Sequence, residues 1–448
     1  MRPSHIVICA SMSISLTACM ANSSDTSLFD AKMTETYSSI AAQSEIGRTT
    51  RNYDKLAPVN TSSTLSTSLR GVGYSIAPEV KTDGRYYIYT VKTPEGTYKV
   101  HGNQLMSKHT RELQALAELK ERNKVVAFAK GAGDAVVTPI KSVYSTVTSP
   151  VKAANNAYDN AKDTYKSAKK GLSKAKTFVT NKGKLPKETA KREKDGMIAG
   201  IVGRPDALRE AAFKLKVDPY THYKPLRSEL KSYASARAAG SFGVDTGLGM
   251  IPGVGGYVVL SVTTVDSITR RTLNKSPKEM AEVNRERLLG NGTSRKAVDK
   301  FLLNSQYTPS EKTIYTGYVK ALERIPGAKT ALVEFGGTPR NRSTAFSNVV
   351  AIKMLNTLHG KQKITKIENV NGQLIAYHHG NATSVILPYD RFSWTHKNEA
   401  NLQKLRASLK HTAGGNTKLV VLGDVTGKSR SAIRQLSWGV VSNFKKVM

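Results

Sequence analysis

The sequence contains very little cysteine, since only Cys9 and Cys19 occur among its 448 residues. Both lie in the first twenty positions, so no disulfide can cross-link the body of the chain, and no cysteine-based zinc site can form there. The chain also lacks a His-Glu-x-x-His motif and a Gly-x-Ser-x-Gly motif. These absences predict no metal site and no cofactor, and they favour a protein that is not an enzyme.

Acidic residues are scarce as well. The chain has 34 Asp and Glu against 68 Lys and Arg, which gives a formal net charge of +34 and a pI near 10.0. A charge of this size attracts anionic partners, so we expect binding to anionic lipid, lipopolysaccharide or an acidic wall polymer, with nucleic acid less favoured. The alternative is a solvated basic surface without a specific ligand.

No uninterrupted apolar run reaches the roughly 20 residues that a membrane-spanning helix needs. The apolar segment 6–16 is too short for that purpose, and Arg2 precedes it. A short apolar segment behind a positive charge is typical of a secretory signal peptide. We therefore expect residues 1–18 to be removed from the mature protein.

The residues Leu16-Thr17-Ala18-Cys19 end this segment. They resemble the lipobox of bacterial lipoprotein signal peptides, in which Leu stands three positions before the cysteine and small residues lie between. The resemblance implies cleavage before Cys19 and acylation of its thiol, which would anchor the chain in a lipid bilayer. It also implies an outer-membrane lipoprotein facing the periplasm or the surface, because Met20 stands where an Asp commonly favours inner-membrane retention. An ordinary secretory signal is the alternative.

Two modules follow the signal. Residues 19–72 are rich in Ser, Thr, Asn and Ala, which predicts a disordered tether with a reach of roughly 40 Å. Residues 73–135 predict a β-hairpin and a helix. The hairpin is expected to turn at Pro94-Glu95-Gly96, and the helix is expected over 105–129.

The strongest periodicity lies in residues 136–196, which we expect to form a basic amphipathic helix and a linker. Apolar residues recur at alternating steps of three and four from Val151 to Val179, as in a heptad seam. The lysines off this seam, which we expect to bind an anionic surface, are Lys152, Lys162, Lys166, Lys169, Lys170, Lys174 and Lys176. The seam also permits an oligomer, whereas docking on the rest of the chain and a solvated spacer are the alternatives.

Residues 197–325 predict a helical domain. Asp218 followed by Pro219 has the form of a helix start, because aspartate caps free amides and proline fits the first helical position. Ser276 and Thr308, each followed by proline, have the same form.

A glycine-rich segment, 238–265, interrupts this domain. Asp245 is its only ionisable residue, and its small residues recur at spacings of four, which predicts a close-packed helical hairpin. Each half is too short to span a bilayer. A hairpin buried in a soluble core is therefore favoured over one that inserts into a membrane, as in a toxin-like or immunity-like protein.

Residues 326–448 predict a small α/β domain. The expected elements are a strand at 331–335, a helix at 347–358, a strand pair that turns at Asn371-Gly372, and a final β-α-β unit. Within that unit, 423–429 nearly matches a phosphate-binding loop, but it has three residues between its glycines where four are needed. It therefore predicts a turn in which Thr426 or Ser429 caps a helix.

Along its whole length the sequence predicts a mixed α+β fold, with an N-terminal β-hairpin, a mostly helical middle containing a long amphipathic helix, and a C-terminal α/β domain. The islands 111–116, 217–221 and 436–441 resemble unassigned proteobacterial proteins, which implies shared architecture but no activity. We expect a non-enzymatic, lipid-anchored envelope protein whose basic surface binds an anionic membrane or polymer. A membrane-active protein inserting 238–265 is the alternative, and an enzyme using the C-terminal domain is third.

Overall fold

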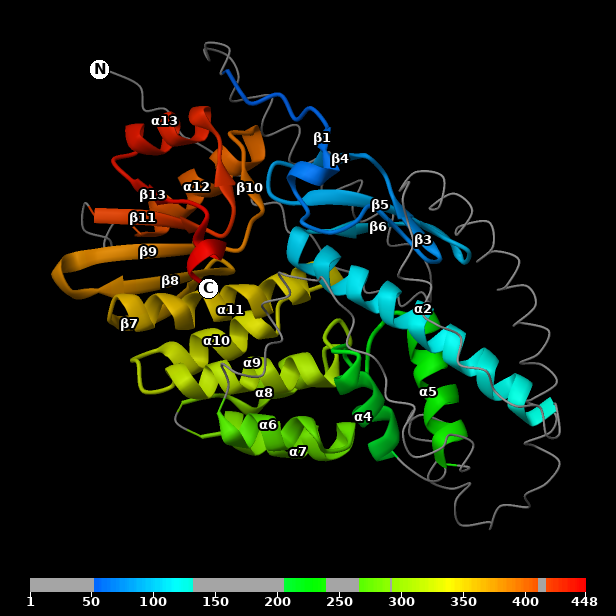
Figure 1. Ribbon diagram of the computed structural model, residues 1–448. Coiled ribbons are helices and arrows are strands. Elements are labelled where there is room, and N and C mark those ends of the chain that lie inside the picture. Colours follow the sequence, from blue (N-terminus) through cyan, green and yellow to red (C-terminus); the bar gives the residue numbers. More distant parts are fainter. Residues whose placement is uncertain (1–51, 132–204, 239–265, 291, 410–415) are drawn as a thin grey trace, which may run out of the picture. The chain divides into compact units, whose positions relative to one another are not determined.

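The computed structural model describes residues 52–131, 205–238, 266–290, 292–409 and 416–448 (Figure 1). The fold is α+β, with an N-terminal antiparallel sheet, a mostly helical middle and a C-terminal sheet flanked by helices, as the sequence predicts. Cys19, the expected heptad helix with its seven lysines, and residues 239–265 lie outside the described residues. In the described ranges, no helix combines the length and the apolar content that crossing a membrane requires.

The N-terminal sheet is built around β5, which pairs with β6 along one side and with β4 and β3 along the other. Its strands are β1 (Val59–Asn60), β2 (Arg70–Gly71), β3 (Tyr74–Ile76), β4 (Glu79–Thr82), β5 (Tyr87–Thr93) and β6 (Gly96–His101), with a 3-10 turn η1 (Thr61–Ser63). The predicted hairpin is confirmed, since Thr93 pairs with Gly96 across the turn. The φ of 141° at Gly96 is one that glycine adopts readily.

This sheet begins earlier in the chain than the expected end of the tether at residue 72. The strands β1 and β2 both lie before that boundary. Thr61 is buried and its hydroxyl donates to the carbonyl of Ala77 at 2.7 Å, while Leu65 is buried in the core of the sheet. Ser/Thr-rich composition therefore does not mark disorder here, because the hydroxyls find main-chain partners.

Three helices form a unit beside this sheet: α2 (Asn103–Gly131), α4 (Pro205–Lys214) and α5 (Lys224–Ala238). The helix expected at 105–129 is confirmed as α2. It packs against α5, which in turn packs against α4. Their shared core consists mainly of Ala and Leu, with one Val and one Tyr, and includes Leu116, Leu119, Leu215, Leu226, Leu230 and Tyr233.

The helix start expected at Asp218 is wrong. Residues 217–223 form a loop between α4 and α5. Asp218 does accept a hydrogen bond from the amide of Tyr220 at 2.9 Å, as a cap would, but its carboxylate also accepts from the hydroxyls of Thr308 and Ser310. These tertiary hydrogen bonds hold the aspartate in a loop, where its local propensity alone would open a helix.

Six helices make up the rest of the helical middle. They are α6 (Ser267–Leu273), α7 (Pro277–Leu288), α8 (Arg295–Leu302), α9 (Pro309–Leu322), α10 (Ala328–Gly336) and α11 (Arg342–Lys361). The predicted starts at Ser276 and Thr308 are confirmed. Each of these residues is directly followed by a proline at the first helical position, and each forms a capping box with the glutamate three positions later.

The strand expected at 331–335 is wrong, because these residues lie inside α10. This helix packs against α8, α9 and β7, so apolar residues occupy most of its circumference. A short continuous apolar run does not distinguish a buried strand from a buried helix. The left-handed Gly327 precedes α10, at a φ of 73°.

The C-terminal sheet has the order β13-β11-β9-β8-β7. Its strands are β7 (Ile364–Val370), β8 (Gln373–His378), β9 (Ala382–Leu387), β11 (Asn416–Val421) and β13 (Gly439–Val441), and α12 (His396–Leu409) and α13 (Gly427–Gln435) follow β9 and β11. A separate two-stranded parallel sheet pairs β10 (Arg391–Phe392) with β12 (Asp424–Val425), and the short helical turns of this domain are η5 (His379–Asn381) and η6 (Phe444–Val447). The predicted β-α-β unit is confirmed, and so is the turn at Asn371-Gly372, where both φ values are positive.

The two faces of this sheet belong to two cores. Alternate residues of β8, β9 and β11 point to opposite faces, as in any strand. Ile386 and Val420 join the core formed with α9, α10 and α11, whereas Val385 and Leu419 join the core formed with α12 and α13. The C-terminal domain is thus continuous with the helical middle through one face of its sheet.

Candidate functional site

The near-match to a phosphate-binding loop, 423–429, is the first site to consider. The hydroxyl of Thr426 accepts a hydrogen bond from the amide of Ser429 at 3.2 Å and so caps α13, as the sequence predicts. Asp54 lies beside this helix start, since its Oδ2 accepts from the Thr426 hydroxyl at 2.6 Å. A carboxylate of the chain itself therefore contacts this loop.

The carboxyl ends of the parallel strands, where α/β folds commonly bind ligands, are also covered by the chain. Asp390 follows β9 and accepts hydrogen bonds from the amides of Tyr87 and Asn103 at 3.1 and 3.0 Å. Its carboxylate thus binds the first main-chain amide of α2. Burial raises the pKa of Asp390 to about 7, although these amides oppose the shift.

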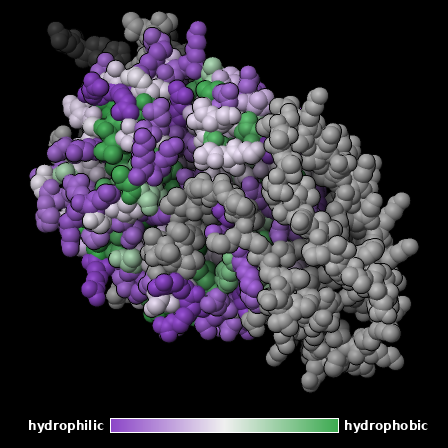
Figure 2. Space-filling model, in the orientation of Figure 1, coloured by the Kyte–Doolittle hydropathy of each residue, from purple (hydrophilic) through white to green (hydrophobic). Residues whose placement is uncertain are grey.

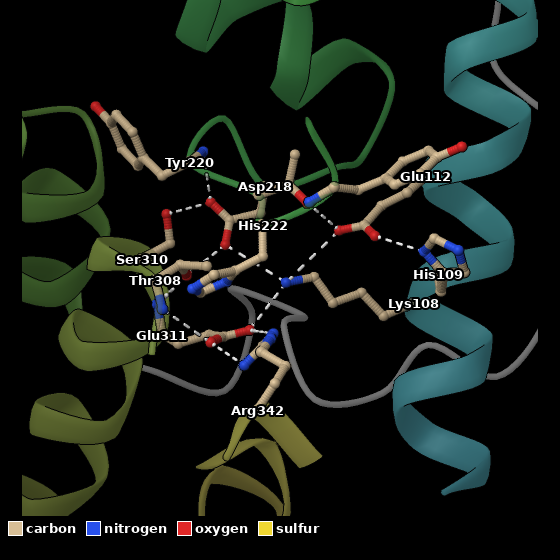
Figure 3. A network of polar contacts seen from close by, with 12 residues as sticks. Lys108, His109, Glu112, Asp218, Tyr220, His222, Thr308, Ser310, Glu311 and Arg342 are labelled. Atoms are coloured by element: carbon tan, nitrogen blue, oxygen red, sulfur yellow. Dashed lines mark hydrogen bonds and ion pairs between the residues drawn. The ribbon is translucent and has the colours of Figure 1, made fainter. Parts of the chain in front are cut away.

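The most concentrated set of charged groups lies elsewhere, where α2, the 217–223 loop and the starts of α9 and α11 meet (Figure 3). At its centre is Lys108, which is 3% exposed. Its Nζ lies 2.9 Å from Glu311, 3.6 Å from Asp218 and 3.7 Å from Glu112. Burial alone would lower the pKa of Lys108, but these carboxylates raise it above its ordinary value.

Glu311 joins Lys108 to a second cation, Arg342 at the start of α11. The two guanidinium Nη atoms donate to the two carboxylate oxygens, one of them at 2.7 Å. Burial would raise the pKa of Glu311, yet the two cations hold it well below the usual range. The same carboxylate accepts from the amide of Thr308 in the capping box, so a helix start and an ion-pair network share one side chain.

A chain of hydrogen bonds leads outward from this network along α2. Glu112 accepts from the hydroxyl of Thr221 at 2.6 Å and lies 3.1 Å from Nδ1 of His109. The other ring nitrogen of His109 lies 2.6 Å from the hydroxyl of Tyr98 on β6. Burial would raise the pKa of Glu112, but Lys108 and His109 hold it at about 2. The ionised carboxylate therefore fixes the orientation of the imidazole.

Part of this network, namely Lys108, His109, Glu112, Thr221 and Arg342, lines a groove with a volume of about 500 Å³. Its walls come from β6, from the first turns of α2, from the loop before α5 and from the start of α11. A cavity of this size falls in the range of small-molecule sites, and convergent polar groups with perturbed pKa values are typical of them. We define the groove by the residues Tyr98, Lys99, His101, His109, His222, Tyr223, Arg342 and Ser343, with Val100, Leu105 and Glu112 also lining it.

Chemically, the network brings together three carboxylates, those of Glu112, Asp218 and Glu311, and two cations, Lys108 and Arg342. In the residues that the structure describes, no cluster of His, Cys, Asp and Glu has the geometry of a metal site. Both oxygens of Glu112 are engaged by His109 and Thr221, and the cations Lys108 and Arg342 are engaged by Glu311, so the charged groups of the network satisfy one another.

The sequence predicted no site here: Glu112 and Thr221 fall in the islands 111–116 and 217–221, which implied no activity, and network partners such as Lys108 and Glu311 are 203 positions apart. The one available signal was the Thr308-x-x-Glu311 spacing, which marks a helix start and gives no hint of a site. Comparison with known proteins adds no assignment: no family model, curated protein or solved structure matches this chain. The groove is therefore interpreted from its own geometry.

Proposed function

We propose that the protein is a non-enzymatic envelope protein, anchored by lipid on Cys19, whose basic surface holds an anionic membrane or envelope polymer. The observation that carries this proposal is the distribution of charge between the interior and the surface. Among the described residues, burial removes as many acidic as basic side chains. The buried acids are Glu112, Asp218, Glu311, Asp390 and Glu399, and the buried bases are Lys108, Arg111, Arg209, Lys329 and Lys353.

The excess positive charge of the described residues therefore stays accessible to solvent. Hydrophilic side chains cover much of the face seen in Figure 2. Exposed Lys and Arg occur on β7, α8, α12 and the C-terminal residues, for example Lys366, Lys296, Arg406 and Lys446. A surface of one sign attracts anionic polymers over a distance of about one Debye length. Binding is thus expected to draw on the folded body as well as on the lysines of 152–176.

The test is the binding of the full-length protein, carrying Cys19→Ser, to vesicles with and without phosphatidylglycerol. We expect binding to the anionic vesicles alone, with an affinity that falls steeply as salt rises, because several lysines release counterions together. Equal binding to the neutral vesicles, or none at low salt, would overturn the proposal.

A matched pair of variants separates the contributions of two regions. One replaces by Gln the seven lysines Lys152, Lys162, Lys166, Lys169, Lys170, Lys174 and Lys176. The other replaces seven exposed lysines of the folded body: Lys296, Lys361, Lys363, Lys397, Lys418, Lys445 and Lys446. Both variants should weaken vesicle binding and flatten its salt dependence. If only the first variant weakens binding, the basic surface of the folded body has no part in it.

The anchor has its own test. Cys19→Ser should abolish incorporation of labelled palmitate and release the protein into the soluble envelope fraction, because a hydroxyl cannot replace the thiol in this acylation. Cys9→Ala, which lies in the segment expected to be removed, should do neither. If the Cys19 variant kept both the label and its membrane attachment, the lipobox interpretation would be wrong.

A further inference from the structure

Strand β6 is an edge strand whose free side opens into the groove. Among the strands that the structure describes, β6 pairs only with β5. The groove lining includes four consecutive residues of β6, which are Tyr98, Lys99, Val100 and His101. Alternate residues of a strand point to opposite faces, so a groove that touches consecutive residues runs along the edge of the strand.

The main-chain groups of every second residue of β6 face this free side. The amide of Gly102 donates to the carbonyl of Tyr87, and the register places the two strands antiparallel. In an antiparallel pair, residues that exchange both main-chain hydrogen bonds alternate with residues that exchange neither. Both the N–H and the C=O therefore point away from β5 at Thr97, Lys99 and His101.

Two contacts agree with this pattern. Thr90 lies opposite Lys99, and its carbonyl accepts from the amide of Ala77 at 3.0 Å, on the other side of β5. The carbonyl of His101 accepts from the hydroxyl of Ser343 at 3.2 Å, on the groove side. In the described part of the chain, the outward donor and acceptor of Lys99 have no such partner, so they are available to a further strand.

The inner face of β6 is apolar and aromatic. Tyr98 and Val100 belong to one apolar cluster with Leu105 and Tyr223, and all four side chains line the groove. A strand added at this edge would therefore place every second side chain against apolar and aromatic surface.

The outer face of β6 is cationic. Directly opposite residues of neighbouring strands share a face, so Lys99, Lys92 and Lys81 all lie on the outer face, and all three are exposed. Among the strand residues of this face, the only carboxylate is that of Glu79 on β4, which is separated from β6 by β5. The other side chains of an added strand would thus meet positive charge.

We propose that the groove binds an extended peptide that adds a strand antiparallel to β6 and alternates acidic with apolar residues. Its main-chain groups would pair with those of Lys99, and antiparallel pairing is the more stable arrangement per residue. Its acidic side chains would lie beside the lysines of the outer face, and its apolar side chains would lie beside Tyr98 and Tyr223.

The surroundings of β6 favour a single peptide strand over a second copy of this chain. The edge lies between walls from α2, the loop before α5 and the start of α11. The β6 strand of a second copy would carry the same walls, and these would collide with the first set. This inference goes beyond the proposed function, since it concerns one defined strand edge and does not depend on the lipid anchor.

The experiment is fluorescence anisotropy of a labelled pentapeptide, Glu-Val-Glu-Val-Glu, titrated with the full-length protein carrying Cys19→Ser. It is done at roughly 0.15 M salt, where the Debye length is about 8 Å. In the proposed arrangement, the main-chain groups of the central glutamate face β6 and those of the valines face away. N-methylation of the central glutamate should therefore weaken binding at least about tenfold, whereas N-methylation of a valine should change it less than about twofold.

The two methylated peptides have the same charge and composition, so attraction to the basic surface alone would affect them equally. Equal affinities of the two, a greater loss at valine, or no binding of the parent peptide would each overturn the proposal. Failure of vesicle binding would leave this result unaffected, because the assay contains no lipid.

Charge reversal locates the peptide. Lys99→Glu should weaken binding of the parent peptide about fivefold or more, and a peptide with lysine as its central residue should bind this variant as well as the parent peptide binds the unaltered site. Lys296→Glu makes the same change at an exposed position of α8, outside the groove lining, and should have no effect. Equal losses in the two variants, or no recovery with the lysine peptide, would also overturn the proposal.

Discussion

A single buried lysine holds three parts of this protein together. Lys108 projects from α2 and contacts carboxylates on α9 and on the 217–223 loop. Ions taken out of water need partners, since an uncompensated buried charge costs several kcal/mol. Each of the three carboxylates around Lys108 has at least one further hydrogen-bond donor, so the charges are shared across the network (Figure 3).

Removing this lysine should therefore destabilise the protein strongly. We expect Lys108→Met to lower the free energy of unfolding by about 3–5 kcal/mol, because Glu311, Asp218 and Glu112 would face one another without the central cation. Urea denaturation followed by circular dichroism measures the change. The exposed Lys92→Met should cost less than about 0.5 kcal/mol. Similar losses in the two variants would mean that the network contributes little.

Asp390 makes stability depend on pH in an unusual direction. Its pKa is raised from 3.8 to about 7 in the folded protein, so between these values the folded state binds more protons than the unfolded state. The free energy of unfolding should then fall as pH rises through this window, by roughly 2–4 kcal/mol from this residue.

The measurement is the difference between the wild-type protein and Asp390→Asn from pH 5 to 8. The amide stays neutral but keeps an oxygen that accepts from Tyr87 and Asn103, so the variant should gain relative stability as pH rises. Carboxylates with lowered pKa values, such as Glu112, cancel in this difference. Asp424→Asn, at an exposed neighbouring position, should show no such trend. A pH-independent difference for Asp390→Asn would contradict the expectation.

At the scale of elements, two helices with the same capping pattern at their starts have very different surroundings. Both α7 and α9 begin with a capping box and a proline. Ser276 is partly exposed and its partner Glu279 is exposed, whereas Thr308 and Glu311 are both buried. In α9 the hydroxyl of Thr308 also donates to Asp218, which ties the helix start to the loop before α5.

This contrast predicts unequal costs for equivalent substitutions. Ser276→Ala should lower the free energy of unfolding by about 0.5–2 kcal/mol, the usual cost of losing an N-cap. Thr308→Ala should cost about 1–3 kcal/mol more, because it also deprives a buried carboxylate of a donor. Thermal and urea unfolding of the two variants measure these losses in the free energy of unfolding. Equal losses would contradict the expectation.

The same elements indicate what the sequence could reveal. Helix starts and the Asn371-Gly372 turn were predictable, since a few adjacent residues determine them. The sequence misled at 331–335 and at Asp218, where burial against distant segments overrides local preference. The groove was not predictable, because its residues come from four separate segments and its histidines and tyrosines have no characteristic spacing in the chain.

For the whole molecule, an excess of positive charge on the surface has a thermodynamic cost. Like charges repel in the compact state, and added salt screens them, whereas buried pairs such as Lys108 with Glu311 are screened much less. We expect the midpoint of thermal unfolding to rise as salt increases from about 0.02 to 0.2 M. A falling midpoint in calorimetry would mean that exposed ion pairs outweigh the repulsion.

The contact between Tyr53-Asp54 and the C-terminal domain has a mechanical consequence. Asp54 accepts from the amide of Trp394 and from Thr426, and the hydroxyl of Tyr53 donates to Glu399. Within the described residues, tension that enters the chain before Tyr53 would first reach these contacts with β10 and the starts of α12 and α13. The load would therefore fall on the C-terminal domain before it reached β1. The N-terminal sheet and the groove beside β6 would bear no load until these contacts of Tyr53 and Asp54 broke.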